Sequence, residues 1–140
     1  MAALAVLLAG LYAGSFLQAL SWRLDRRSRA RTAGRPDPYP GTSILTSRSA
    51  CPLCGHVLGP LELFPVLGWA LLRGRCRHCG GRIAETPHWE AAVAVLFLAS
   101  YLAWPRPLSG PALAGLVAWL AVVATVSGLA ALVLQRRRAG

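Results

Sequence analysis

Long uncharged stretches of the chain constrain its fold more than any other feature. Residues 1–22 and 107–135 contain no Asp, Glu, Lys or Arg, and a shorter uncharged stretch covers residues 91–104. A helix needs about 20 apolar residues to cross the hydrocarbon core of a bilayer. The two outer stretches meet that length, whereas the middle one spans only if it begins near Trp89 or packs against its neighbours. We therefore expect a mostly α-helical membrane protein with three transmembrane helices, at residues 1–24, 89–105 and 111–135.

The first apolar stretch could be either a retained membrane helix or a cleaved signal peptide. A signal peptide carries its positive charges before the apolar core. Here the order is reversed, because the first basic residue is Arg23 and it follows the apolar run. The sequence therefore favours a retained helix.

The distribution of arginine predicts how the protein is oriented. All 15 basic residues are arginines, and the formal net charge is +10. Most lie between Arg23 and Arg82, three form the tail at residues 136–140, and Arg106 lies in the short loop between the last two apolar stretches. Under the positive-inside rule, this pattern places the N-terminus outside and the central segment and C-terminus in the cytoplasm. Arginines beside a bilayer also suit contact with anionic lipid headgroups.

Two segments between the first and second apolar stretches have distinct compositions. Residues 25–50 are rich in Arg and Pro and lack apolar periodicity, which predicts a cytoplasmic loop. Residues 61–72 are apolar apart from Glu62 but too short to span, and Pro65 and Gly68 would break a helix. We expect this second segment to lie at the membrane interface or to cover the neighbouring cysteines.

The strongest chemical signal is a pair of Cys-x-x-Cys turns, each followed by glycine. Such turns aim two thiolates at one ion, and the glycine tolerates the positive φ that they often require. Four thiolates around Zn²⁺ would leave a net charge near −2, which nearby arginines at 73, 75 and 77 could offset. The sequence therefore predicts a small zinc-ribbon-like module at residues 51–88, with a structural zinc ion. Its expected ligands are Cys51, Cys54, Cys76 and Cys79.

Other uses of these cysteines are weaker. Disulfides are disfavoured because the arginines place the cysteines in the reducing cytoplasm. A redox pair needs only one Cys-x-x-Cys, and neither turn lies in a βαβ pattern. His56 and His78 could each replace one thiolate, although we expect them to lie beside the site.

The acidic residues do not predict an active site. The chain contains Asp25, Asp37, Glu62, Glu85 and Glu90, and none lies in either outer apolar stretch. Acid–base hydrolysis needs two carboxylates held on rigid elements beside the scissile bond. Glu90 is placed to begin the second membrane helix, where a carboxylate suits the helix dipole. We therefore assign no catalytic residue.

Three stretches together resemble one family: GSFLQALSWRL (14–24), SRSACPLCGHVLGPLELFPVLGWALLRGRCRHCGGRI (47–83) and PHWE (87–90). They are similar to the N-terminal domain of type IV prepilin peptidases, also called leader peptidase/N-methyltransferases. The resemblance runs from residue 8 to about residue 104 and includes Pro65, Gly68 and Trp69 between the cysteine pairs. It implies a bacterial inner-membrane protein that handles prepilin leader peptides on the cytoplasmic side. It also implies that the four cysteines are zinc ligands, and that S-adenosylmethionine is a cofactor only if the family's methylation activity is retained.

The sequence also departs from that family. The family's peptidase chemistry uses two aspartates in later helices, one in a Gly-x-Gly-Asp motif, and this motif is absent here. At the cytoplasmic end of the third apolar stretch, where the resemblance would place the first such acid, the chain carries Ser127 in TVSGLAAL. We therefore expect a protein that is not catalytic alone and acts in pilin or pseudopilin processing with a separate peptidase chain.

Two alternatives stay open on the sequence alone. One is a free-standing prepilin peptidase/N-methyltransferase whose active residues are not recognised. The other is a membrane-anchored zinc ribbon that binds nucleic acid through its arginines. Nucleic acid is the less expected partner, because Tyr39 is the one aromatic residue interleaved with the arginines of residues 23–48.

Overall fold

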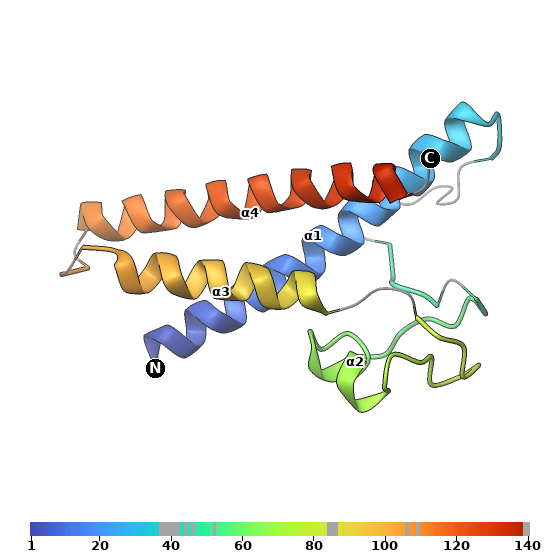
Figure 1. Ribbon diagram of the computed structural model, residues 1–140, viewed down its shortest axis with the longest axis horizontal. Coiled ribbons are helices and arrows are strands. Elements are labelled where there is room, and N and C mark those ends of the chain that lie inside the picture. Colours follow the sequence, from blue (N-terminus) through green and yellow to red (C-terminus); the bar gives the residue numbers. More distant parts are fainter. Residues whose placement is uncertain are drawn as a thin grey trace.

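Four helices make up the regular structure of the residues that can be described. The computed structural model describes residues 1–36, 43, 45, 47–51, 53–83, 87–105, 107–108 and 110–138, with only the backbone of Gln135 and Arg138. The helices are α1 (Ala2–Thr32), α2 (Leu67–Leu71), α3 (His88–Ala103) and α4 (Gly110–Arg138). In Figure 1, α3 and α4 lie side by side, α1 crosses them, and α2 lies among the loops that precede α3.

Two of the helices are long and apolar enough to cross a membrane. These are α1 and the Gly110–Leu134 part of α4, whereas α3 is a shorter apolar helix of 16 residues. Two of the three expected spans thus coincide with helices of suitable length and composition, and α3 lies where the third was expected. The basic tail expected from Arg136 is still helical as far as Arg138, so it forms the last turn of α4.

The first helix differs most from the sequence-based expectation, because it continues from Asp25 to Thr32 where we expected a loop. Local contacts explain the extension. Arg29 Nε donates to Asp25 Oδ2 at 2.7 Å, one turn apart, and Arg26 lies over the Trp22 ring at 4.8 Å from its centroid. The helix ends just before Gly34, which adopts a φ of 63° that a larger side chain would resist.

Close contact between α1 and α3 depends on two glycines. A Cβ atom at Gly10 would lie 2.7 Å from the Ala94 Cα, and one at Gly14 would lie 2.9 Å from the Glu90 Cα. Both glycines are buried, as is Val93 on the facing side of α3. The contact uses the Gly-x-x-x-Gly spacing common in membrane helices.

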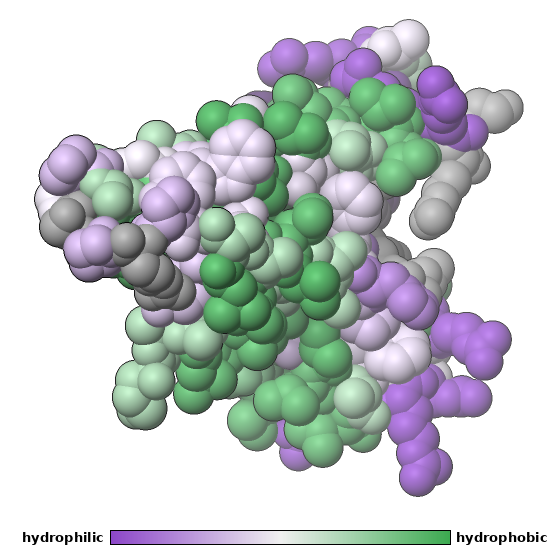
Figure 2. Space-filling model, turned by 60° about the vertical axis from the view of Figure 1, so that its left-hand side comes forward, coloured by the Kyte–Doolittle hydropathy of each residue, from purple (hydrophilic) through white to green (hydrophobic). Residues whose placement is uncertain are grey.

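The outer faces of the long helices are apolar. Leu4, Leu8, Val117, Val126 and Leu129 are among the exposed large side chains of α1 and α4. Figure 2 shows a broad apolar surface over the helices, with hydrophilic side chains gathered at one side of the molecule. A broad apolar surface of this kind fits contact with lipid hydrocarbon.

Candidate metal centre

The two Cys-x-x-Cys turns fold into matching knuckles. In the first, the Gly55 N–H donates to the Cys51 carbonyl at 2.9 Å, and in the second the Gly80 N–H donates to the Cys76 carbonyl at 2.9 Å. Gly55 and Gly80 have φ values of 72° and 67°, as the sequence predicted. Isolated antiparallel bridges close the knuckles, Ala50 to Val57 in the first and Arg75 to Arg82 in the second.

The knuckles bring the four predicted ligands together. The Sγ atoms of Cys51, Cys54, Cys76 and Cys79 all lie within 4.8 Å of one another. Across the knuckles, Cys51 Sγ is 4.0 Å from Cys79 Sγ, and Cys54 Sγ is 3.9 Å from Cys76 Sγ. A tetrahedral zinc site with Zn–S bonds of about 2.3 Å has S–S edges of about 3.8 Å. All four are free thiols rather than disulfides, so the donor set and its spacing fit an ion such as Zn²⁺.

The thiols of Cys51 and Cys54 have different pKa values. Backbone N–H groups of Leu53 and Cys54 lower the pKa of Cys51 to about 7. At Cys54 the His56 N–H acts in the same direction, but desolvation and the neighbouring thiols outweigh it and raise the pKa to about 12. Four adjacent thiolates therefore need a cation to exist together, and an ion that binds here must displace protons.

The two histidines lie beside the cysteine cluster. The His56 and His78 rings stack at a centroid distance of 4.9 Å, with 12° between their planes. Among the described residues, the group able to hold a metal consists of the four cysteines alone. Of the nearby arginines, Arg75 reaches the knuckle backbone, with Nη1 3.5 Å from the Gly80 carbonyl oxygen.

The segment between the knuckles contains a short helix, which corrects the expectation that Pro65 and Gly68 would prevent one. Helix α2 includes Gly68, where a Cβ would lie 2.8 Å from the Glu62 carbonyl oxygen. Pro65 precedes the helix, and the Leu67 N–H donates to its carbonyl across a tight turn at Val66. Val66 has φ 61° and ψ −50°, the rare and strained form of γ-turn.

Glu90 fixes this strained turn to α3. Its Oε2 accepts a 2.6 Å hydrogen bond from the Val66 N–H. Glu90 lies in the first turn of α3, as expected, and its bond to Val66 also ties the segment between the knuckles to this helix. The Phe64 ring meets the Tyr12 ring of α1 edge-on at 5.8 Å, so the same segment contacts both helices.

Comparison with known proteins agrees with this arrangement. Residues 8–104 match the family described as the bacterial peptidase A24 N-terminal domain. The chain belongs to this family. The match covers most of α1, both knuckles, α2 and α3, and this confirms the resemblance found in the sequence.

Several characterised relatives are prepilin-processing proteins. The chain is 36% identical over 124 residues to an Escherichia coli type 4 prepilin-like proteins leader peptide-processing enzyme, covering 84% of this chain and 45% of the relative. It is 40% identical over 131 residues to a Burkholderia pseudomallei prepilin leader peptidase/N-methyltransferase, covering 84% and 42%. The chain thus spans less than half the length of these relatives. No solved structure matches it.

The described acidic residues of this A24 N-terminal domain each accept a hydrogen bond within the fold. Asp25 pairs with Arg29. Glu62 Oε2 accepts the Gly59 N–H at 2.7 Å, and Glu90 accepts the Val66 N–H. Asp37 and Glu85 lie outside the described residues.

Proposed function

We propose that the chain is the metal-binding part of a prepilin-processing system in the bacterial inner membrane. Two apolar helices and prepilin peptidase relatives support an inner-membrane location. The four-cysteine centre, with sulfur spacings suited to tetrahedral Zn²⁺, is the observation that carries the proposal. In this proposal zinc orders the cytoplasmic module, and the module presents α2 and the knuckles to prepilin leader peptides.

The carboxylates for peptide cleavage would come from outside these residues, on a separate peptidase chain. The three described carboxylates support this view, because each accepts an N–H from its own surroundings. Two-carboxylate proteolysis needs both groups at one site, one acting as base and one as acid. The relatives' names also include N-methyltransferase. If this chain supports methylation, S-adenosylmethionine would be the methyl donor.

A reconstitution assay tests this proposal. The purified chain, loaded with zinc in lipid, is expected not to cleave a type IV prepilin. Cleavage is expected when a separate peptidase-domain chain is added, and it should fall when that chain is combined with a Cys51→Ser, Cys76→Ser variant. A different result would support a free-standing enzyme. In that case the chain alone would cleave the prepilin, and the double variant Asp25→Asn, Asp37→Asn would still do so, which would mean that other residues are catalytic.

We further propose that residues 25–50, the cysteine module and the C-terminus all face the cytoplasm. A reporter fused after Gly140 is therefore expected in the cytoplasm, and one inserted at Ser109 is expected outside. The physical reason is the arginine bias, with Arg136 and Arg137 at the end of α4 and several arginines at the end of α1. Paired alkaline phosphatase and fluorescent protein fusions measure this. A periplasmic C-terminus would mean that the short α3 does not cross the bilayer.

A further inference from the structure

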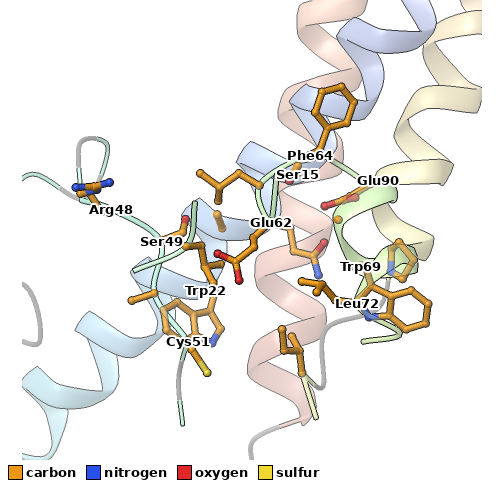
Figure 3. A pocket seen from close by; sticks show the side chains of 18 of the residues that line it. Ser15, Trp22, Arg48, Ser49, Cys51, Glu62, Phe64, Trp69, Leu72 and Glu90 are labelled. Carbon is orange, nitrogen blue, oxygen red and sulfur yellow. The ribbon is translucent and has the colours of Figure 1, made fainter. Parts of the chain in front are cut away.

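A cavity lies between the first membrane helix and the cysteine module. Its volume is about 460 Å³, within the range of about 300–1,000 Å³ that small-molecule sites occupy. The walls come from several elements far apart in sequence (Figure 3): Gln18 and Trp22 of α1, Cys51 of the first knuckle, and Glu62, Trp69 and Leu72 of the segment between the knuckles.

Glu62 is a buried polar group of this cavity that is only partly paired. Its side chain is only 9% exposed, and Figure 3 shows its carboxylate directed into the cavity between Trp22 and Trp69. One oxygen, Oε2, accepts the Gly59 N–H at 2.7 Å. The other, Oε1, is buried and accepts no hydrogen bond from any residue that the structure describes. A carboxylate can accept about four hydrogen bonds, and leaving a buried one short of donors is costly.

The neighbouring cationic groups do not meet this need. His56 Nε2 lies 3.9 Å from Glu62 Oε2, beyond hydrogen-bond range. Three arginines also line the cavity. Arg23 donates to Ser49 Oγ at 3.1 Å and Arg26 lies over the Trp22 ring, whereas Arg48 lies apart from the Glu62 carboxylate in Figure 3. None of these contacts involves Glu62, so the part of the cavity beside this carboxylate favours a cationic donor over an anion.

We infer that this cavity binds a ligand with a primary ammonium group on an apolar body. The ammonium would occupy the part of the cavity beside Glu62, where a compact cation with three N–H donors meets an under-paired carboxylate. The apolar body would lie against Trp22, Trp69 and Leu72, since indole rings bind both apolar groups and cations. A free amine and the amino terminus of a peptide both carry this chemistry. The inference stands apart from the proposed role in prepilin processing, because it rests on the cavity alone.

The inference is tested by measuring how phenethylamine binds to the full chain in nanodiscs, with zinc supplied. Saturable binding is expected above an empty-nanodisc control, and the isosteric neutral alcohol should bind at least about tenfold more weakly, as expected for loss of a charged hydrogen bond. Glu62→Gln keeps an acceptor for the Gly59 N–H but removes the charge, and it should weaken amine binding by a similar factor. Asp25→Asn removes a carboxylate outside the cavity and should leave binding unchanged.

A second set of measurements separates the two sources of the amine. The binding of Leu-Gly-Gly amide is compared with that of phenethylamine. If the peptide amide binds more tightly and loses binding when its amino group is acetylated, the natural ligand is a peptide amino terminus. If phenethylamine binds more tightly, the natural ligand is a free amine. Leu72→Trp should weaken both by filling the cavity without changing charge. Three outcomes would each overturn the inference. The amine and the alcohol could bind equally well, or a Glu62→Gln variant with normal zinc content could bind the amine as tightly as the parent protein. The third is saturable binding of inorganic phosphate instead of the amine. The wild-type comparison of amine with alcohol decides the matter even if both variants misfold.

Discussion

Removal of the metal is expected to unfold the module at residues 50–83 while the long helices remain. The module has little core of its own: in the part that is described, its buried side chains include Cys51 and Cys76, at 3% and 2% exposure, while Leu61, Leu67 and Leu71 are exposed. Two isolated bridges and a five-residue helix supply little further order. In comparable small modules, zinc contributes about 10 kcal/mol or more of folding free energy.

Cys51→Ser and Cys76→Ser should therefore abolish zinc binding and amide protection across this module. Zinc analysis combined with hydrogen exchange measures both effects. Arg77→Ser, an exposed change beside Cys76, is the matched control and should retain zinc. Acidification should also release the ion. Protons compete for the sulfurs, and below about pH 7 even Cys51 is mostly protonated without metal. Full protection of residues 50–83 in metal-free protein would show that the fold does not depend on zinc.

Gly10→Ala with Gly14→Ala is expected to weaken the α1–α3 contact by several kcal/mol. Within a helix, alanine is normally favoured over glycine by about 1 kcal/mol, so local propensity alone predicts a gain in stability. Here the added Cβ atoms would lie 2.7 Å and 2.9 Å from backbone Cα atoms of α3, which cannot move without separating the helices. Overpacking of this kind costs about 1–3 kcal/mol at each position. The sign of the effect therefore separates tertiary packing from local propensity.

Thermal unfolding in nanodiscs measures the change, with Gly128→Ala as the control. A Cβ at Gly128 would meet the end of the flexible Leu17 side chain at 3.0 Å, which can rotate away, so a small effect is expected. A double alanine variant as stable as the parent protein would contradict the close helix contact. Because Glu90 and Val93 lie on the facing side of α3, separation of these helices should also loosen the Glu90–Val66 hydrogen bond.

Local chemistry explains why some features could be read from the sequence. Cys-x-x-Cys-Gly specifies its own turn, because the glycine adopts positive φ and the backbone directs both sulfurs to one side, and the knuckles formed as predicted. The uncharged blocks likewise predicted α1 and α4 from length and composition. The extension of α1 to Thr32 could also have been predicted, because the one-turn pairs Trp22–Arg26 and Asp25–Arg29 are visible in the sequence. Gly10 could have been found from its Gly-x-x-x-Gly spacing with Gly14.

The helical membrane character, the four-cysteine centre and the family could all be predicted from the order of the amino acids, because each follows from residues close together or from a residue's own chemistry. Which distant groups meet depends instead on how the separate elements pack. Nothing near Val66 in sequence signals its strained turn, because the bond that holds the turn comes from Glu90 on α3. Likewise, Glu62 becomes a candidate ligand-binding residue only because α1, the first knuckle and α2 enclose a cavity around it. Contacts of this kind depend on how separate elements pack, and packing is a property of the whole fold.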